Sequence, residues 1–175
     1  MHRAAGWSLI ETLIAIAIVG VLAALAAPAL GHALARQQAL AAGNDFLGAL
    51  HHARSAAIGS GARVILCPSA DGLRCMPGTR WDGGWLLALD RDHDDQPDAA
   101  PLLRAAAAPQ LRIVSSRGRP LLRFRADGSA AGSNATITVC HRGRAETTRL
   151  LVMSNSGRVR AARADAANAA ACAAL

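Results

Sequence analysis

The sequence predicts an α+β protein in which one long N-terminal helix, transmembrane in its first part, packs on a C-terminal antiparallel β-rich domain. The first observation is an apolar run, residues 13–30, made almost entirely of Ala, Leu, Ile and Val, which is long enough to span a bilayer. The second is a change of hydrophobic period from Arg63 onward, from helical spacing to short runs separated by turn residues. The rest of the 175 residues suffices for one soluble domain of ordinary size.

The apolar run begins beside a carboxylate. Residues 12–35 carry no formal charge when His32 is counted as neutral, and Glu11 directly precedes them. An acidic side chain near the bilayer interior costs roughly 2.5 to 3.5 kcal/mol on insertion scales. Glu11 therefore needs a partner or a task, which an ordinary membrane anchor would not supply.

Two simpler interpretations leave part of this segment unexplained. A secretory signal peptide would use Arg3 as its positive lead and residues 24–26 as an A-x-A-like cleavage site. A plain N-terminal anchor would need only the apolar run. Neither requires Gly6 or Glu11, whereas a short leader cut after Gly6 would leave Trp7 as the new N-terminus.

Residues 6–11, G-W-S-L-I-E, resemble the processing site of the type IV pilin superfamily, whose precursors carry Gly, usually Phe, and then T/S-L-I-E. Trp7 replaces the usual Phe with another bulky aromatic residue. The resemblance implies that a prepilin peptidase cuts after Gly6 and methylates the new amino group of Trp7. It also implies that Glu11 pairs with the N-terminal amine of a neighbouring subunit, and that Pro28 kinks the helix because one carbonyl loses its donor.

The resemblance divides the chain into four parts. Residues 1–6 are the leader, residues 7–34 the transmembrane and filament helix, residues 35–60 its amphipathic continuation, and residues 61–175 a β-rich periplasmic globular domain. The expected location is the inner membrane, crossed once, and then a pilus or pseudopilus filament. After Pro28 the helix is expected to continue to about Gly59, because apolar residues recur at roughly helical spacing. These residues are Ala33, Leu34, Leu40, Phe46, Leu47, Leu50, Ala53, Ala57 and Ile58.

Short runs with strand-like patterning follow the helix. In residues 135–140, alternate side chains are expected to point to opposite faces, and Arg142-Gly143 marks the turn of a hairpin. Asp127-Gly128 marks a second turn. The candidate strands are residues 63–67, 84–90, 111–116, 120–125, 135–140, 147–153 and 157–161.

Four cysteines, Cys67, Cys75, Cys140 and Cys172, are expected to form disulfides, because a domain outside the inner membrane lies in an oxidising compartment. Four cysteines allow three connectivities, which the sequence does not distinguish. We favour Cys67–Cys75 with Cys140–Cys172, since the second bond would tie the Ala-rich tail to the sheet and contribute about 3 to 4 kcal/mol. Neither pair has the spacing of a zinc site.

No other metal site is predicted. Residues 90–98 carry acids at positions 1, 3 and 5 of a calcium-type loop, but Asp95 stands where such a loop has Gly and Pro101 where it has Glu. We interpret this run as a solvated acidic loop. His51 and His52 have no carboxylate or Cys partner at ligand spacing.

The sequence also contains no catalytic constellation. There is no G-x-S-x-G, no H-E-x-x-H and no phosphate-binding Gly loop. His141 follows Cys140, but a cysteine held in a disulfide cannot act as a nucleophile. We therefore expect neither an enzymatic activity nor a cofactor.

Positive charge is concentrated in the C-terminal half. All 19 basic residues are Arg; residues 101–163 hold twelve of them against two acidic residues, whereas residues 64–100 hold three against seven. In the run S-G-R-V-R, strand alternation is expected to put Arg158 and Arg160 on one face and Val159 against the core. Arg163 continues this cluster. A solvated strand face that balances the acidic loop would explain the same residues.

Cys67, the W-D-G-G-W segment at residues 81–85, the acidic loop and the late G-R-V-R resemble the FimT/GspH group of minor pilins and pseudopilins. FimT-like members carry a G-R-x-R motif that binds DNA during uptake. The resemblance implies sequence-independent binding of double-stranded DNA, in agreement with the Arg-rich surroundings. The implied DNA-binding residues are Gly157, Arg158, Arg160, Arg163, Arg142, Arg144 and Arg149.

Two functions therefore stay open. One is a FimT-like minor subunit of a type IV pilus that contacts DNA during natural transformation. The other is a GspH-like minor pseudopilin of a type II secretion system, which would contact protein partners instead. We favour the first, because the G-R-x-R motif would serve DNA binding and has no evident use in a secretion subunit. In both cases the partners are other pilin or pseudopilin subunits and a prepilin peptidase.

Overall fold

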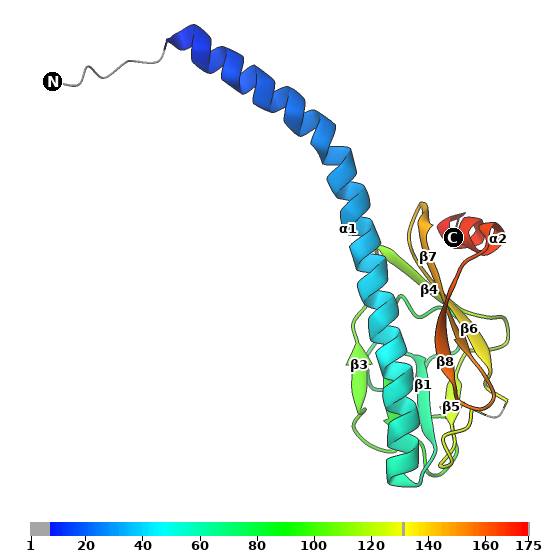
Figure 1. Ribbon diagram of the computed structural model, residues 1–175. Coiled ribbons are helices and arrows are strands. Elements are labelled where there is room, and N and C mark those ends of the chain that lie inside the picture. Colours follow the sequence, from blue (N-terminus) through cyan, green and yellow to red (C-terminus); the bar gives the residue numbers. More distant parts are fainter. Residues whose placement is uncertain (1–7, 131, 175) are drawn as a thin grey trace. The chain divides into compact units, whose positions relative to one another are not determined.

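The computed structural model describes residues 8–130 and 132–174 (Figure 1). The chain divides into two compact units, Met1–Ala35 and Arg36–Leu175. The first unit is helical over its described residues, where it forms the N-terminal part of α1 (Leu9–Ser60). The helix runs without interruption through Pro28. It ends directly before Gly61, whose φ of 61° is a conformation that glycine adopts without strain.

The second unit contains the end of α1, eight strands and a short C-terminal helix, so the predicted α+β class and the antiparallel β-rich domain are confirmed. Every strand pair is antiparallel, and the strands form two four-stranded sheets. The first sheet has the order β3-β2-β1-β5, with β1 (Val64–Pro68), β2 (Trp85–Leu89), β3 (Leu103–Ala105) and β5 (Leu122–Phe124). The second has the order β4-β6-β7-β8, with β4 (Leu111–Ser115), β6 (Ala135–His141), β7 (Arg144–Met153) and β8 (Val159–Arg163).

One hydrophobic core joins α1 to both sheets. Phe46 and Leu50 of α1 are fully buried, and the Phe46 ring lies edge-on to Trp81 and Trp85 at centroid distances of 5.3 and 5.5 Å. Strand residues of both sheets complete this core, which explains why the second half of α1 carries the amphipathic pattern that the first half lacks. The other face of the first sheet packs against the loop that contains Cys75.

Two elements were not predicted. β3 is three residues long and largely exposed, so it carries no alternating pattern; pairing with β2 alone makes it a strand. The Ala-rich tail forms α2 (Ala166–Ala174), which packs on β6 and β7. The hairpin at Arg142-Gly143 is confirmed: it joins β6 to β7, and Gly143 has a φ of 70°.

Candidate functional site

The start of α1 presents an acidic side chain. Ser8 caps the helix, because its hydroxyl accepts the backbone N–H of Glu11 at 3.3 Å. Glu11 is exposed in the first turn, and no described residue forms an ion pair with its carboxylate. Gly6 and Trp7, the predicted cleavage and methylation positions, lie outside the described residues. α1 is long and apolar enough to cross a membrane, and its most apolar window is exposed throughout.

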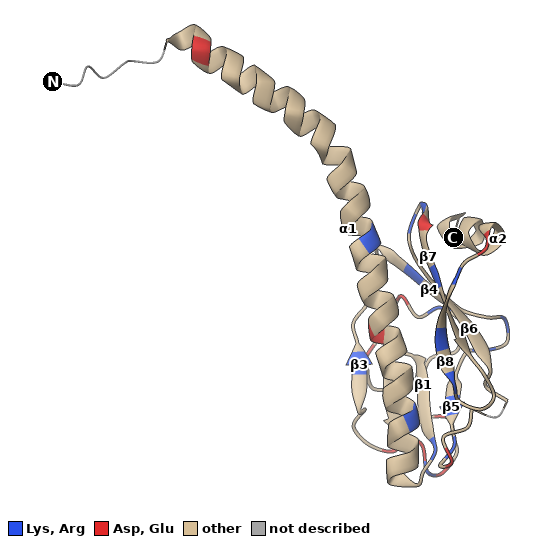
Figure 2. Cartoon of the chain, in the orientation of Figure 1, with Lys and Arg blue, Asp and Glu red and all other residues tan. Residues whose placement is uncertain are grey.

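Arginines are spread over many elements of the second unit (Figure 2), and their partners divide them into separate groups. One group surrounds Asp82, whose side chain is 3% exposed. The Asp82 Oδ2 atom lies 2.8 Å from a guanidinium nitrogen of Arg80, 3.1 Å from one of Arg142 and 3.7 Å from one of Arg112. Burial by itself raises the pKa of Asp82, but the hydrogen bond from Arg80 and the charges of Arg80 and Arg112 outweigh it, so the pKa lies below its ordinary value.

The Arg142 side chain is therefore bound within the protein. Its guanidinium bridges Asp82 and the carbonyl of Leu111, at 3.1 and 3.3 Å. Arg144, another of the predicted DNA-binding residues, lies 4.0 Å from the carboxylate of Glu146. The structure thus separates these two residues from the cluster at β8.

Arg158 and Arg160 lie at an exposed sheet edge. β8 is the edge strand of its sheet and pairs only with β7. Both arginines are exposed, whereas Val159 between them packs against the core, as the strand alternation predicts. No carboxylate of the described residues lies within ion-pair distance of either side chain, so both guanidiniums are available to an external anion.

The other two predicted arginines occupy the opposite face of this sheet. Arg163 pairs with Arg149 across β7 and β8, whereas Arg160 pairs with Val152. Because side chains alternate along a strand, Arg149 and Arg163 face away from Arg158 and Arg160. They line a hollow of about 630 Å³ together with Arg36 of α1. Arg163 therefore does not continue the cluster, which is a correction of the expected arrangement.

Gly157 shapes the turn that precedes Arg158. It is buried and has a φ of 75°. A Cβ atom at this position would lie 2.0 Å from the carbonyl oxygen of Gly128, closer than real Cβ contacts allow. The same two turns are joined by a hydrogen bond from the Ala130 N–H to the Asn155 carbonyl, 2.9 Å. The glycine of the G-R-x-R motif is thus required by packing against the turn at Gly128.

Two disulfides fix the ends of the sheets. Cys67 of β1 is bonded to Cys75, and Cys140 of β6 is bonded to Cys172 of α2, which is the pairing favoured from the sequence. Cys172 is buried, so α2 is held on the second sheet by packing and by a covalent bond. No cysteine of this unit is free.

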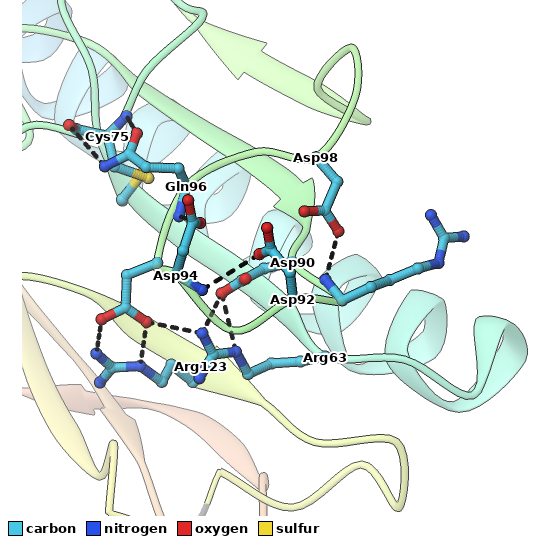
Figure 3. Close-up of polar contacts among 11 residues, drawn as sticks. Arg63, Cys75, Asp90, Asp92, Asp94, Gln96, Asp98 and Arg123 are labelled. Atoms are coloured by element: carbon cyan, nitrogen blue, oxygen red, sulfur yellow. Dashed lines mark hydrogen bonds and ion pairs between the residues drawn. A yellow bond between two sulfur atoms is a disulfide. The ribbon is translucent and has the colours of Figure 1, made fainter.

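The acidic loop after β2 is only partly solvated, which corrects the sequence-based interpretation (Figure 3). Asp90 is fully buried and accepts two hydrogen bonds from Arg63, of which the one from Nε measures 2.8 Å. Asp95 is bound by Arg63 and by Arg123 of β5. The hydrogen bond from Arg123 and the two positive charges lower the pKa of Asp95.

Comparison with known proteins assigns this architecture. Residues 42–157, more than half of the chain, match the family described as type II transport protein GspH. The chain belongs to the GspH family. Residues 1–27 of this GspH-family chain also match the prokaryotic N-terminal methylation motif. No curated protein sequence matches it significantly.

Solved structures agree on the fold. The type IV minor pilin FimU of Pseudomonas aeruginosa PAO1 in space group P21 has a TM-score of 0.60 and 21% identity, over 73% of this chain and 90% of that one. The same protein in space group P65 has a TM-score of 0.53 and 20% identity, over 74% of this chain and 90% of that one. The minor pseudopilin EpsH from the type 2 secretion system of Vibrio cholerae has a TM-score of 0.50 and 16% identity, over 73% of this chain and 95% of that one. The GspH-family chain thus shares its fold with a minor pilin and with a minor pseudopilin.

Proposed function

We propose that this chain is a minor subunit of a type IV pilus that binds double-stranded DNA through Arg158 and Arg160, without sequence preference. The observation that carries the proposal is a pair of exposed guanidiniums, Arg158 directly before the edge strand β8 and Arg160 within it, that no described carboxylate neutralises. Alternate residues on a strand lie about 7 Å apart, so each guanidinium can contact a different phosphate. Such contacts release counterions and hold DNA irrespective of its sequence.

The aromatic residues favour a duplex over a single strand. Single-stranded nucleic acid is commonly held by exposed rings on which bases stack. The chain has three Trp, two Phe and no Tyr, and all four rings that the structure describes are buried. Contact with the phosphate backbone of a duplex needs no such rings, which supports duplex DNA as the ligand.

The N-terminal segment would direct the processing of the subunit and its assembly into the filament. We propose that a prepilin peptidase in the inner membrane cuts after Gly6 and methylates Trp7, and that α1 then holds the subunit in the filament. The carboxylate of Glu11, which pairs with no described residue, supports assembly through this helix, because a carboxylate in an apolar environment is stable only beside an opposite charge. The amine of a neighbouring subunit would supply that charge. The second unit, with Arg158 and Arg160, would lie on the periplasmic side.

The test measures binding of the full-length chain, in neutral detergent, to a fluorescent DNA duplex at several salt concentrations. We expect the log–log salt slope to fall by roughly 0.9 for each phosphate that Arg158→Ala with Arg160→Ala no longer neutralises. The control is Arg74→Ala with Arg104→Ala, two exposed arginines with the same total charge change. Absence of binding at low salt, or equal weakening in both double variants, would contradict the proposed site.

A second candidate is a minor pseudopilin of a type II secretion system. The description of the matching family and the likeness to EpsH favour it. Deletion of the gene separates the two functions. Loss of transformation or of pili with normal protein secretion supports the pilus subunit, and loss of secretion with normal transformation supports the pseudopilin.

A further inference from the structure

We propose that the loop between β2 and β3 binds one divalent cation, Ca²⁺ in preference to Mg²⁺, through the carboxylates of Asp90, Asp92 and Asp98. Each of these residues offers an oxygen atom, and the three atoms lie within 4.8 Å of one another at the end of β2 (Figure 3). Carboxylate oxygens are the ligands that Ca²⁺ prefers. The proposal is independent of DNA binding.

A buried oxygen without a partner points to a ligand at this position. The Asp90 side chain is fully buried, and its Oδ2 atom accepts hydrogen bonds from Arg63. Its Oδ1 atom is also buried but has no hydrogen-bond partner among the described residues. Such an oxygen is costly in a native protein, and a bound ion is one of its ordinary explanations. Coordination by a cation would satisfy Oδ1 while Arg63 continues to hold Oδ2.

The carboxylates of Asp92 and Asp98 would also be stabilised by the proposed cation. Asp92 and Asp98 are exposed, and neither forms an ion pair with a described arginine; Asp98 accepts the backbone N–H of Arg91. The carboxylates of Asp90, Asp92 and Asp98 each place an oxygen within 4.8 Å of the other two, so their negative charges repel one another. A divalent cation would relieve this repulsion between like charges.

The backbone of the loop removes one objection to a calcium site. Calcium loops of the type suggested by the spacing have Gly at the sixth position, where the chain turns sharply. Asp95 occupies that position here and itself adopts a φ of 68°. Arg63 and Arg123 hold its carboxylate in place. Asp98, at the ninth position, adds the third carboxylate in place of the missing Glu.

The nature of the ligands selects the ion. None of the three is His or Cys, which disfavours zinc. Ca²⁺ accepts six to eight oxygen ligands in irregular arrangements, so water and backbone carbonyls can complete three clustered carboxylates, whereas Mg²⁺ demands near-octahedral geometry. Gln96 links the same loop to Cys75 through a 2.9 Å hydrogen bond, so cation binding would also fasten the disulfide loop to the first sheet.

The test titrates CaCl₂ and MgCl₂ by calorimetry into the full-length chain in neutral detergent after removal of metal with EDTA. We expect one Ca²⁺ per chain, with a dissociation constant on the order of 10⁻⁴ to 10⁻³ M, as in extracellular calcium modules, and a rise in Tm. Asp92→Asn with Asp98→Asn is expected to weaken binding by about tenfold or more and to abolish the rise.

The control is Asp127→Asn with Asp165→Asn, which removes the same charge from two turns where Asn can accept the same backbone N–H groups. It is expected to bind Ca²⁺ like the wild type. No heat of binding up to about 10 mM CaCl₂, or equal weakening in both double variants, would overturn the proposal. Binding of Mg²⁺ as tight as that of Ca²⁺ would overturn the stated preference.

Discussion

Arg112 and Arg142 beside Asp82, and Arg158 and Arg160 at β8, belong to the same basic half of the chain but differ in whether a carboxylate neutralises them. Arg112 and Arg142 lie beside a buried carboxylate, and Arg112 is itself buried. Arg158 and Arg160 lie at the start of an exposed edge strand, and no carboxylate of the described residues lies within ion-pair distance of them. The comparison teaches that the charge of a segment overstates its free positive surface, because part of that charge is already neutralised inside the fold.

The largest effect is expected from Asp82→Asn. The substitution removes the negative charge that Asp82 places beside the buried Arg112, and breaking a buried ion pair costs about 3 to 5 kcal/mol. Urea unfolding of the full-length chain in neutral detergent measures the destabilisation. Asp45→Asn, an exposed acid of α1, is the control and should change the free energy of unfolding by less than about 0.5 kcal/mol. Equal stability of the two variants would show that the arginines do not depend on Asp82.

The pH dependence of stability tests the same group of arginines around Asp82. The pKa of Asp82 is lower in the folded protein than in the unfolded chain, where it is about 3.9. Its contribution to stability is therefore fully present above about pH 4 and is lost as the pH falls through the folded pKa. The difference in stability between wild type and Asp82→Asn should shrink below about pH 4, and a difference that stays constant would contradict this assignment.

A smaller destabilisation is expected from Gly157→Ala, which changes the turn that holds the free arginines. The positive φ and the Gly128 carbonyl together should cost about 2 to 4 kcal/mol. Gly143→Ala is the matched control, since Gly143 has a φ of 70° but open space around it, and only the backbone cost of about 1 kcal/mol is expected. Equal destabilisation in the two variants would show that the close approach to Gly128 contributes nothing.

The smallest effect on stability is expected from Arg158→Ala with Arg160→Ala. Neither side chain has an ion-pair partner among the described residues, so the free energy of unfolding should stay within about 0.5 kcal/mol of the wild type. Arg142→Ala breaks a half-exposed bridge to Asp82 and should cost about 1 kcal/mol. A large destabilisation in the β8 variant would place these two arginines with the structural group and weaken the DNA proposal.

Much of the fold follows from local patterns. The end of α1, the hairpin at Arg142-Gly143 and seven of the eight strands are indicated by helical spacing, alternation and turn residues, because these signals come from neighbouring residues. β3 carries no such signal, and α2 has an Ala-rich run capped by Asp165 but no helical spacing of large apolar residues. The first exists through pairing with β2, and the second through packing and a disulfide to β6.

The candidate site divides in the same way. Alternation in the sequence predicts that Arg158 and Arg160 share an exposed face, and the structure agrees. The position of Arg163 could not be predicted, because it depends on the register between β7 and β8, which places it opposite Arg149 on the other face. The close approach of Gly157 to Gly128 could not be predicted either, because the two glycines lie in turns that are far apart in the chain.

The sequence by itself determined the family of this protein, its apolar helix with one carboxylate and the basic character of its C-terminal half, since these are properties of composition and order. The tertiary structure decided which arginines are free and which are bound. It also decided that Asp90 is buried with one oxygen that no described residue satisfies. Both depend on the partners that folding brings together over distances in sequence that no local pattern spans.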